Sequence, residues 1–406
     1  MKRKNGEGSW GEKTIKGVVY KYFRDPNGKY FYGKTQKEIK EKIKKHEESS
    51  FVNIRKDDSL FGEYMKSWLY NVKQKSVKRR TFDGYEEYFL NNVVNFDGFN
   101  ISDMKIQKIT PENMTEYFNS MAEKYALSTI KKTQSIINQC FEYAVDNKVI
   151  PENPCLRATI PSEDNVAKPR KEIPFLTIED IEKLYNVSNL KQVRINKKKD
   201  NEDLIYGNNA KIIVLIMYTG LRISEALGLK WSDIDFANKQ LHVKRNLSRV
   251  KNRTGEGAAT IMVETTLKRE SSKRTIPLAN RAIEALEYLK EHTNYKSKND
   301  YVCSTSKGTL ATARNITRTL QSMLIRGECE VEQCGLHSLR HSFGSYLLSK
   351  NVEISVISRL LGHKDITVTY KIYIHVLKQS QIDAIKVFDI DINNIDDDYN
   401  DNDDEG

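Results

Sequence analysis

Apolar residues between Asp58 and Pro154 recur at steps of three and four positions, which is the period of an amphipathic helix. The first stripe consists of Leu60, Phe61, Tyr64, Met65, Trp68, Leu69 and Val72. A second helix is expected after Thr110, which can cap it with Pro111 in the first turn, and a third is expected from Ser128. Because none of these stripes has reactive spacing, the pattern predicts a helical bundle with an apolar core.

A shorter period marks residues 1–48, where aromatic and basic residues alternate in segments typical of strands. Thr14–Phe23 and Lys29–Lys34 are expected to be strands joined by the turn sequence Asp-Pro-Asn-Gly at 25–28. A helix is expected next, with Thr35 as its cap and Glu38 completing a capping box. One face of the sheet would pack on this helix, and the other would present cations to phosphates or to a major groove, a solvated face being the alternative. The cations concerned are Lys16, Lys21, Arg24 and Lys29.

From residue 175 to Phe388 the pattern mixes helices with a short antiparallel section. Thr177 is expected to begin the first helix, and the expected strands are Gln240–Leu247, Thr260–Thr266 and Arg274–Leu278. The polar stretch 189–209 is typical of an insertion loop.

The fold class predicted is multidomain α+β. A small sheet-and-helix domain covers residues 1–50, and an all-helical domain covers 55–160. A proline-containing linker at 161–174 precedes a mainly helical domain with a small antiparallel sheet at 175–388. The acidic tail at 389–406 is expected to be disordered, because it has too few apolar residues to order itself.

Charge changes this picture, because the basic residues are not spread evenly. The formal charge is +11, but the stretch from Asp389 to Gly406 holds nine acids and neither Lys nor Arg, so the preceding part carries +20. An excess of this kind favours a polyanion such as nucleic acid. Further basic clusters lie in the helical segment, and they include Lys78, Arg79, Arg80, Lys131 and Lys132.

Several other classes of protein find little support. The five dispersed cysteines are typical of reduced thiols, and no apolar run approaches the ~18 residues that a membrane span requires. The chain has no Walker loop and no His-Glu-x-x-His, and its calcium-like run from Asp389 has Asn394 where such a loop requires glycine. We therefore expect a soluble cytoplasmic protein that uses no metal and no cofactor.

Three separated stretches carry candidate chemistry. Thr219–Leu227 has the pattern of a helix that ends at a glycine before another begins, which puts Arg222 at a tight turn. His337 and Arg340 lie one helical turn apart and share a face, with Leu339, Phe343, Tyr346 and Leu347 expected on the buried stripe. The third stretch ends a helix at Gly362 and His363, and Tyr373 follows ten residues later.

Together these stretches resemble the tyrosine recombinase (phage integrase) family, in particular the integrases of conjugative transposons and phages of Gram-positive bacteria. The motifs occur in the family's order and the resemblance covers nearly the whole chain. It implies an arm-site DNA-binding domain at 1–50, a core-binding domain at 55–160 and a catalytic domain at 175–388. It also implies the roles of six residues. In these roles Arg222 and Arg340 bind the scissile phosphate, His337 and His363 are hydrogen-bonding partners of that phosphate, Lys268 is the general acid and Tyr373 is the nucleophile.

Two of these assignments have competitors in the sequence. Lys268 shares its expected hairpin turn with Arg269, Lys273 and Arg274. Tyr370 is a second phenol, but the family places the nucleophile before an x-His-Val step, which selects Tyr373. Apolar residues alternate with period two from Ile366 to Val376, which is typical of a strand, whereas the family implies a helix, and we adopt the helix.

The function implied is site-specific recombination of DNA, in which the protein integrates and excises a mobile element through a covalent 3′-phosphotyrosyl intermediate. The partners implied are double-stranded DNA, three further copies of the chain in a tetramer, and an excision factor or host bending protein. A topoisomerase of type IB shares this chemistry and is one alternative. A non-catalytic, architectural DNA-binding protein is the other.

Overall fold

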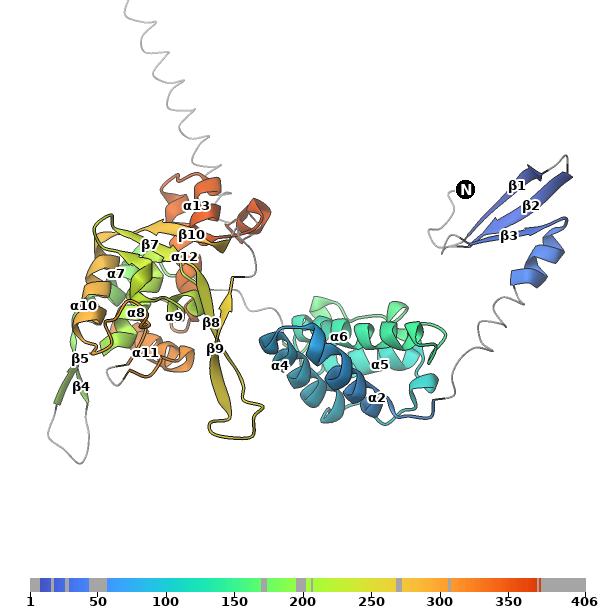
Figure 1. Cartoon of the computed structure of the whole chain (residues 1–406), viewed down its shortest axis with the longest axis horizontal. Helices are drawn as coiled ribbons and strands as arrows, with labels where there is room; N and C mark the ends of the chain where they lie inside the picture. The colour runs from blue at the N-terminus through green and yellow to red at the C-terminus, as the bar shows by residue number, and fades with distance from the viewer. Residues whose placement is uncertain are drawn as a thin grey trace, which may run out of the picture. The chain divides into compact units, whose positions relative to one another are not determined.

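The computed structural model describes most of the chain, which divides into two compact units (Figure 1). The described residues are 8–15, 18–25, 29–43, 57–168, 174–194, 202–205, 207–267, 272–305, 308–370 and 372–373. One compact unit spans Met1–Lys171 and the other spans Glu172–Gly406. Both helices and small antiparallel sheets are present, which confirms the predicted α+β class.

The first unit begins with an antiparallel sheet of β1 (Ser9–Ile15), β2 (Val18–Arg24) and β3 (Tyr30–Gly33), in that order. The predicted strand Thr14–Phe23 was wrong, because it joined the end of β1 to most of β2. β1 escaped prediction since its sequence is polar and contains Gly11, which has no side chain. This glycine lets the ring of Tyr22 lie across β1, where an added Cβ would come within 2.5 Å of that ring.

A helix over residues 36–43 covers one face of this sheet. The predicted cap is confirmed, because the Thr35 hydroxyl accepts a hydrogen bond from the Glu38 backbone at 3.2 Å. Ile39 is fully buried beside Gly33, and Phe31 is buried on the same side.

Cross-strand pairing divides the cations of the sheet between its two faces. Lys21 pairs with Gly33 and therefore shares the face on which the helix packs. Arg24 pairs with Tyr30, whose ring its guanidinium overlies at 5.4 Å, on the opposite face. Lys21 and Arg24, which were expected on one face, therefore lie on opposite faces of the sheet, and Lys16 lies outside the described residues.

A helical bundle makes up the rest of the first unit, as predicted. Its helices are α2 (Phe61–Trp68), α3 (Gln74–Ser76), α4 (Arg79–Tyr88), α5 (Pro111–Ala122) and α6 (Leu127–Asp146), with π-helical continuations at Leu69–Lys73 and Phe89–Val94. Short 3₁₀ turns lie at Ile106–Lys108, Pro154–Leu156 and Glu163–Asn165.

The ends of the bundle helices test the predicted caps. Thr110 caps α5 as expected, since its hydroxyl accepts from the Asn113 backbone at 3.3 Å and the Asn113 side chain accepts from the Thr110 backbone at 3.0 Å. The predicted start of α6 at Ser128 was wrong, because the helix begins at Leu127 and its N-cap residue, Ala126, has no capping side chain. Leu127 is itself buried, so packing stabilises the first turn.

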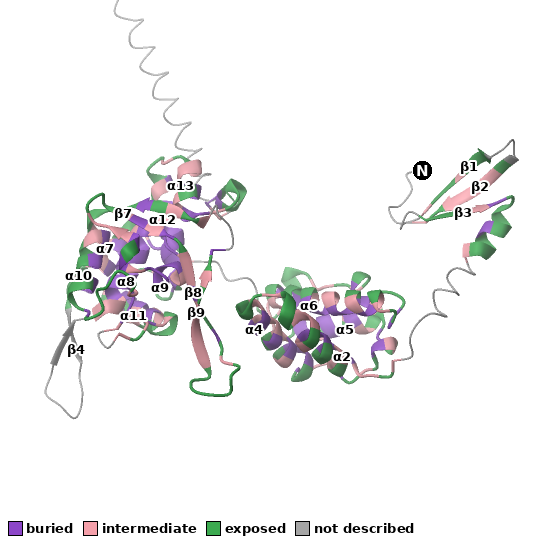
Figure 2. Ribbon diagram, in the orientation of Figure 1, coloured by how far each residue is buried: buried purple, intermediate pink, exposed green. Residues whose placement is uncertain are grey.

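The helices of the bundle bury their inward faces (purple in Figure 2), and the core they enclose contains several aromatic rings. Phe61 and Phe141 stack with their ring centroids 4.7 Å apart, and the buried Tyr117 hydroxyl donates to the Asn92 carbonyl at 2.6 Å. The chain after α6 packs back on the bundle, where the backbone N–H of Ala167 donates to the Ala122 carbonyl at 2.8 Å.

The second unit is built around α8 (Gly207–Thr219), which is purple along most of its length in Figure 2 because it is buried on nearly all sides. The other helices are α7 (Ile178–Asn189), α9 (Ile223–Leu227), α10 (Asn280–Glu291), α11 (Ala313–Arg326), α12 (Leu336–Ser349) and α13 (Ile354–Leu361), with a 3₁₀ turn at Trp231–Asp233. α8 contacts α7, α10, α11 and α12. Thr177 caps α7 as predicted, accepting from the Asp180 backbone at 3.1 Å.

Three small sheets accompany these helices. One has the order β10 (Arg274–Pro277), β7 (Gln240–Val243), β6 (Ile234–Asp235), and two-stranded ribbons are formed by β8 (Arg245–Lys251) with β9 (Thr260–Thr266) and by β4 (Lys191–Arg194) with β5 (Glu202–Ile205). The bounds predicted for β9 are confirmed. The expected strand Gln240–Leu247 was wrong, because the chain passes from one sheet to another at Lys244. The loop expected at 189–209 also contains β4 and β5.

The segment after α13 is helical at residues 366–370 and 372–373, which confirms the helix and overturns the strand that alternation suggested. Thr369 and Tyr373, one turn apart, are buried, whereas Val368 and Tyr370 are exposed. Residues 374–406, with the predicted acidic tail, lie outside the described part of the chain. Within the described part, no helix combines the length and apolarity that a membrane crossing demands.

Candidate active site

Arg222 lies at the turn between α8 and α9, as the sequence predicts. Gly220 adopts a φ of +63°, a left-handed conformation that favours glycine, and it packs closely on Phe343 of α12. Arg222 then takes an extended conformation as the N-cap of α9. The turn therefore fixes where the Arg222 side chain leaves the backbone.

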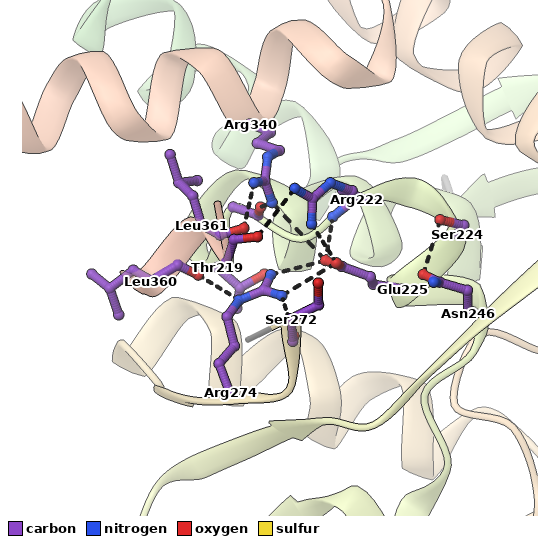
Figure 3. Close-up of polar contacts among 12 residues, drawn as sticks. Thr219, Arg222, Ser224, Glu225, Asn246, Ser272, Arg274, Arg340, Leu360 and Leu361 are labelled. Atoms are coloured by element: carbon purple, nitrogen blue, oxygen red, sulfur yellow. Dashed lines mark hydrogen bonds and ion pairs between the residues drawn. The ribbon is translucent and has the colours of Figure 1, made fainter. Parts of the chain in front are cut away.

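A single carboxylate, that of Glu225 in α9, lies among three guanidinium groups (Figure 3). Its Oε1 accepts from Arg222 Nη1 at 2.7 Å and from Arg274 Nη1 at 3.2 Å. Its Oε2 accepts from Arg274 Nη2 at 2.8 Å and lies 4.0 Å from Arg340 Nη1. One negative charge therefore faces three positive charges, and the cluster has an excess of positive charge.

The same three arginines also bind the end of α13. Three successive backbone carbonyls there accept from three different guanidinium groups: Leu360 from Arg274 Nε at 2.6 Å, Leu361 from Arg340 Nη2, and Gly362 from Arg222 Nη2 at 3.4 Å. These carbonyls lie at a helix C-terminus, where they lack partners inside the helix. Gly362 closes α13 in a left-handed conformation, as the sequence predicts.

Burial and the excess of positive charge in this cluster shift the pKa values of Glu225 and Arg340. Burial opposes ionisation of Glu225, but hydrogen bonds and charge from Arg274 and the charge of Arg222 lower its pKa to about 2. Burial and the neighbouring charge of Arg222 lower the pKa of Arg340 to about 9. An anion placed against Arg340 would relieve this unfavourable environment.

Both predicted histidines lie beside these charges. His363 hydrogen-bonds through Nδ1 to the Thr369 hydroxyl at 2.8 Å, and burial followed by the charges of Arg340 and Arg222 lowers its pKa to about 4. His337 is partly exposed in the first turn of α12, and partial desolvation with the same two charges lowers its pKa also. In the absence of an anion, His363 is therefore neutral at pH 7.

Tyr373 is buried and lies on α12. Only 1% of the residue is exposed, compared with 49% of Tyr370. Its hydroxyl lies where the Cβ of a side chain at Gly344 would be, at 2.1 Å from that position. Burial raises the pKa of Tyr373 to about 12, and the charge of Arg340 opposes the increase. Of the two candidate phenols, Tyr373 is therefore the one that is buried and that lies close enough to Arg340 for the charge of that residue to affect its pKa.

Five of the six predicted catalytic residues are therefore gathered in one place, while Lys268 lies outside the described residues. The buried stripe of α12 is confirmed for Leu339, but Tyr346 was wrongly placed on it and is 37% exposed. Prediction from sequence missed Glu225, His341 and Thr369, and it named Arg274 only as a competitor of Lys268. Glu225 alone had a local signal, because it occupies the third helical position after Arg222, where a capping-box acid is favoured.

The predicted DNA-binding cations of the bundle are exposed. Lys78, Arg79 and Arg80 form the N-cap and first turn of α4. Lys131 and Lys132 are exposed in the second turn of α6. No group of three or more His, Cys, Asp or Glu side chains suited to a metal ion occurs in the described ranges.

Comparison with known proteins agrees with this geometry. The Phage integrase family matches residues 174–380, and the phage integrase N-terminal SAM-like domain matches residues 60–122. The chain is 30% identical over 388 residues to a tyrosine recombinase XerC-like protein of Caldanaerobacter subterraneus subsp. tengcongensis, and the match covers 89% of this chain and 93% of that relative.

Solved structures give the same fold. The Tn1549 transposon integrase in complex with a circular intermediate DNA has a TM-score of 0.61 at 19% identity, covering 78% of this chain and 95% of that one. A lambda integrase tetramer bound to a Holliday junction has a TM-score of 0.55 at 18% identity, covering 87% of this chain and 92% of that one. At these low sequence identities, the structural matches show a shared fold and no more than that.

Proposed function

Since the chain belongs to the phage integrase family of tyrosine recombinases, we propose that its arginine cluster holds the scissile phosphate of a DNA strand while Tyr373 attacks it. The protein is a tyrosine-type site-specific DNA recombinase. Its substrates are proposed to be the attachment sites of a mobile element that it integrates and excises. The observation that carries the catalytic assignment is the convergence of Arg222, Arg340 and Tyr373 in one subunit.

Arg340, one of the two proposed phosphate ligands, differs from an ordinary surface arginine because its side chain is only 2% exposed. Attack on a phosphodiester develops negative charge on the nonbridging oxygens, and a guanidinium offers five N–H donors in a planar fork. Arg340 uses Nη1 and Nη2 on the Gly220 and Leu361 carbonyls, and the carboxylate of Glu225 is 4.0 Å away. Its charge is therefore poorly compensated until a phosphate arrives.

The nucleophile needs help, because a phenol with a pKa near 12 is protonated at pH 7. The neutral imidazoles of His337 and His363 are proposed to supply hydrogen bonds, and one of them to accept the phenolic proton. As the bond from the Tyr373 oxygen to phosphorus forms, the bond from phosphorus to the 5′ oxygen breaks. Lys268 is proposed to deliver a proton to that leaving oxygen. The 3′-phosphotyrosyl intermediate is resealed when a second 5′ hydroxyl attacks it.

The remaining parts of the chain are proposed to grip DNA. Residues 1–50 are assigned to arm sites, residues 55–160 to the core site, and 175–388 to catalysis, with 161–174 as a linker and 389–406 as a tail. Lys78, Arg79, Arg80, Lys131 and Lys132 are exposed, which supports contact with phosphates, and Lys16, Lys21, Arg24 and Lys29 are proposed for the arm site. Four copies are proposed to act together on two duplexes, with an excision factor or host bending protein as a further partner.

A nicked suicide substrate tests this proposal, because loss of a short fragment after cleavage traps the protein on the DNA. We expect the wild-type protein to form the adduct in EDTA, the Tyr373→Phe variant to bind DNA without forming it, and the Tyr370→Phe variant to form it. An adduct formed by Tyr373→Phe but not by Tyr370→Phe would contradict the proposal.

Two rival functions predict other results in the same assay series. A non-catalytic DNA-binding protein would yield no covalent product from any variant. An enzyme of the topoisomerase class would relax supercoiled plasmids that contain no attachment site.

A further inference from the structure

Arg274 has contacts unlike those of the two arginines assigned to the phosphate. Its side chain is only 6% exposed, and it binds both oxygens of Glu225 at 2.8 and 3.2 Å. Its Nε donates to the Leu360 carbonyl at 2.6 Å, and its Nη1 lies 3.4 Å from the Ser272 carbonyl. With both terminal nitrogens and Nε engaged by the protein, Arg274 is poorly suited to bind substrate.

The contacts of Arg274 nevertheless control those of its neighbours. Arg274 binds the two oxygens of Glu225 side by side, a geometry that fixes the plane of the carboxylate. In that plane the carboxylate lies close to Arg222 and 4.0 Å from Arg340. Without Arg274 the carboxylate would keep the Nη1 and the backbone N–H of Arg222 as donors, at 2.7 and 2.9 Å, but it would lose the paired contact that sets its orientation toward Arg340.

A second contact links Arg274 to the end of α13. Leu360, which it binds, directly precedes the two residues whose carbonyls bind Arg340 and Arg222. Gly362 is pressed against Arg274, since an added Cβ there would lie 2.8 Å from its Nη1. Arg274 therefore anchors both partners that the phosphate-binding pair share, the carboxylate and the row of carbonyls (Figure 3).

We propose that Arg274 is a positioning residue for strand cleavage: it holds Glu225 and the end of α13 so that the guanidinium groups of Arg222 and Arg340 point at one phosphate. This inference rests on the proposed function, in which that pair compensates the charge of the scissile phosphate. Arg274 itself touches neither the phosphate nor the nucleophile.

Changing the substrate separates a positioning role from a merely structural one. In a methylphosphonate a neutral methyl group replaces one charged nonbridging oxygen, so correct placement of the two arginines matters less. We expect Arg274→Gln to slow single-turnover cleavage of the ordinary phosphate on the order of 10²-fold, as a small misplacement of catalytic groups does. On the methylphosphonate substrate the same variant is expected to lose less than about threefold, because little charge remains to be compensated.

Arg245 offers a matched control in the same unit. Its side chain is 17% exposed and it binds the buried carboxylate of Asp233 and the Gly228 carbonyl, but none of the catalytic arginines. Arg245→Gln should therefore affect both substrates equally, even where it lowers the melting temperature. If Arg274→Gln does not fold, Arg274→Lys replaces it, with a smaller loss confined to the phosphate substrate.

The outcomes are distinct. Equal losses of Arg274→Gln on both substrates, or no loss on either, would overturn the positioning role. Arg222→Ala is measured in parallel, and its loss should be larger on the phosphate substrate than on the methylphosphonate. If Arg222→Ala lost equal activity on the two substrates, that result would instead contradict the assignment of Arg222 and Arg340 to the phosphate.

Discussion

Individual side chains around the arginine cluster illustrate what a sequence can and cannot predict. Arg222, His337, Arg340, His363 and Tyr373 stand in motifs whose order suggests a single site, and the structure gathers them. The contact between Glu225 and Arg274 has no such signature, because the two residues lie 49 positions apart and meet only through tertiary packing. The sequence also offered Arg274 as a competitor of Lys268, whereas its burial gives it a different part in the site.

His341 is the least satisfied side chain of this neighbourhood. It is 8% exposed, and its Nε2 is buried without a hydrogen-bond partner in the described part of the chain. Its ring meets that of His337 edge to face at 4.4 Å. Burial, followed by the nearby His337 and Arg340, lowers the pKa of His341 to about 4.

This environment makes a prediction about stability and pH. The unfolded chain binds a proton at His341 near pH ~6.5, whereas the folded chain resists it until pH falls toward 4. The contribution of His341 to the free energy of unfolding is therefore fully present above pH ~6.5. As the pH falls from there to about 4, this contribution decreases by up to ~1.4 kcal/mol per pH unit. We expect urea unfolding of His341→Leu to vary less with pH over this range than that of the wild type. His363 contributes the same sense of change, so a residual slope is expected. An unchanged slope in His341→Leu would contradict the buried, neutral imidazole.

At the scale of elements, the local sequence pattern predicted secondary structure correctly where an element buries one face. It failed where tertiary contacts determine which residues are buried or where a strand ends. The stripe of α2 predicted its helix, because one side of it packs into the bundle. The alternation from Ile366 to Val376 misled, because Val368 and Tyr370 are exposed while Thr369 and Tyr373 are buried against the domain. The break between β7 and β8 was equally hidden, since the sequence stays strand-like through Lys244 while the chain changes sheets.

The Tyr373 segment packs on α12, and the proposed attack by Tyr373 depends on this contact. Gly344 makes it possible, since the Tyr373 hydroxyl occupies the space where a side chain at that position would begin. Gly344→Ala is expected to lower the melting temperature by displacing Tyr373, although alanine favours a helix by about 1 kcal/mol over glycine. A fluorescence or calorimetric melt measures the change.

Gly84 in α4 supplies the matched control for this substitution, because nothing lies within 4 Å of the Cβ that alanine would add. Gly84→Ala should raise the melting temperature, so the two substitutions should have opposite signs. A rise in both variants would show that Tyr373 does not pack against Gly344.

For the whole molecule, charge is organised at two levels. The chain before the acidic tail carries +20, which favours a polyanion whatever its sequence. The cluster around Glu225 concentrates positive charge at one point in the second unit, where it can act on a single phosphate. The net positive charge could be predicted from composition. The arginine cluster could not, because it forms only where α9, α12, α13 and β10 meet in the folded domain.

Identification of the DNA-linked residue tests most directly the claim that Tyr373 attacks a phosphate held by Arg222 and Arg340. The adduct on a nicked attachment site is digested with nuclease and trypsin, and the nucleotide-bearing peptide is sequenced by mass spectrometry. Trypsin cuts after Lys364, Lys371 and Lys378, so the two candidate phenols fall in different peptides, 365–371 and 372–378. The account predicts a nucleotide on Tyr373 in the peptide 372–378. A nucleotide on Tyr370, or on any residue outside that peptide, would contradict it.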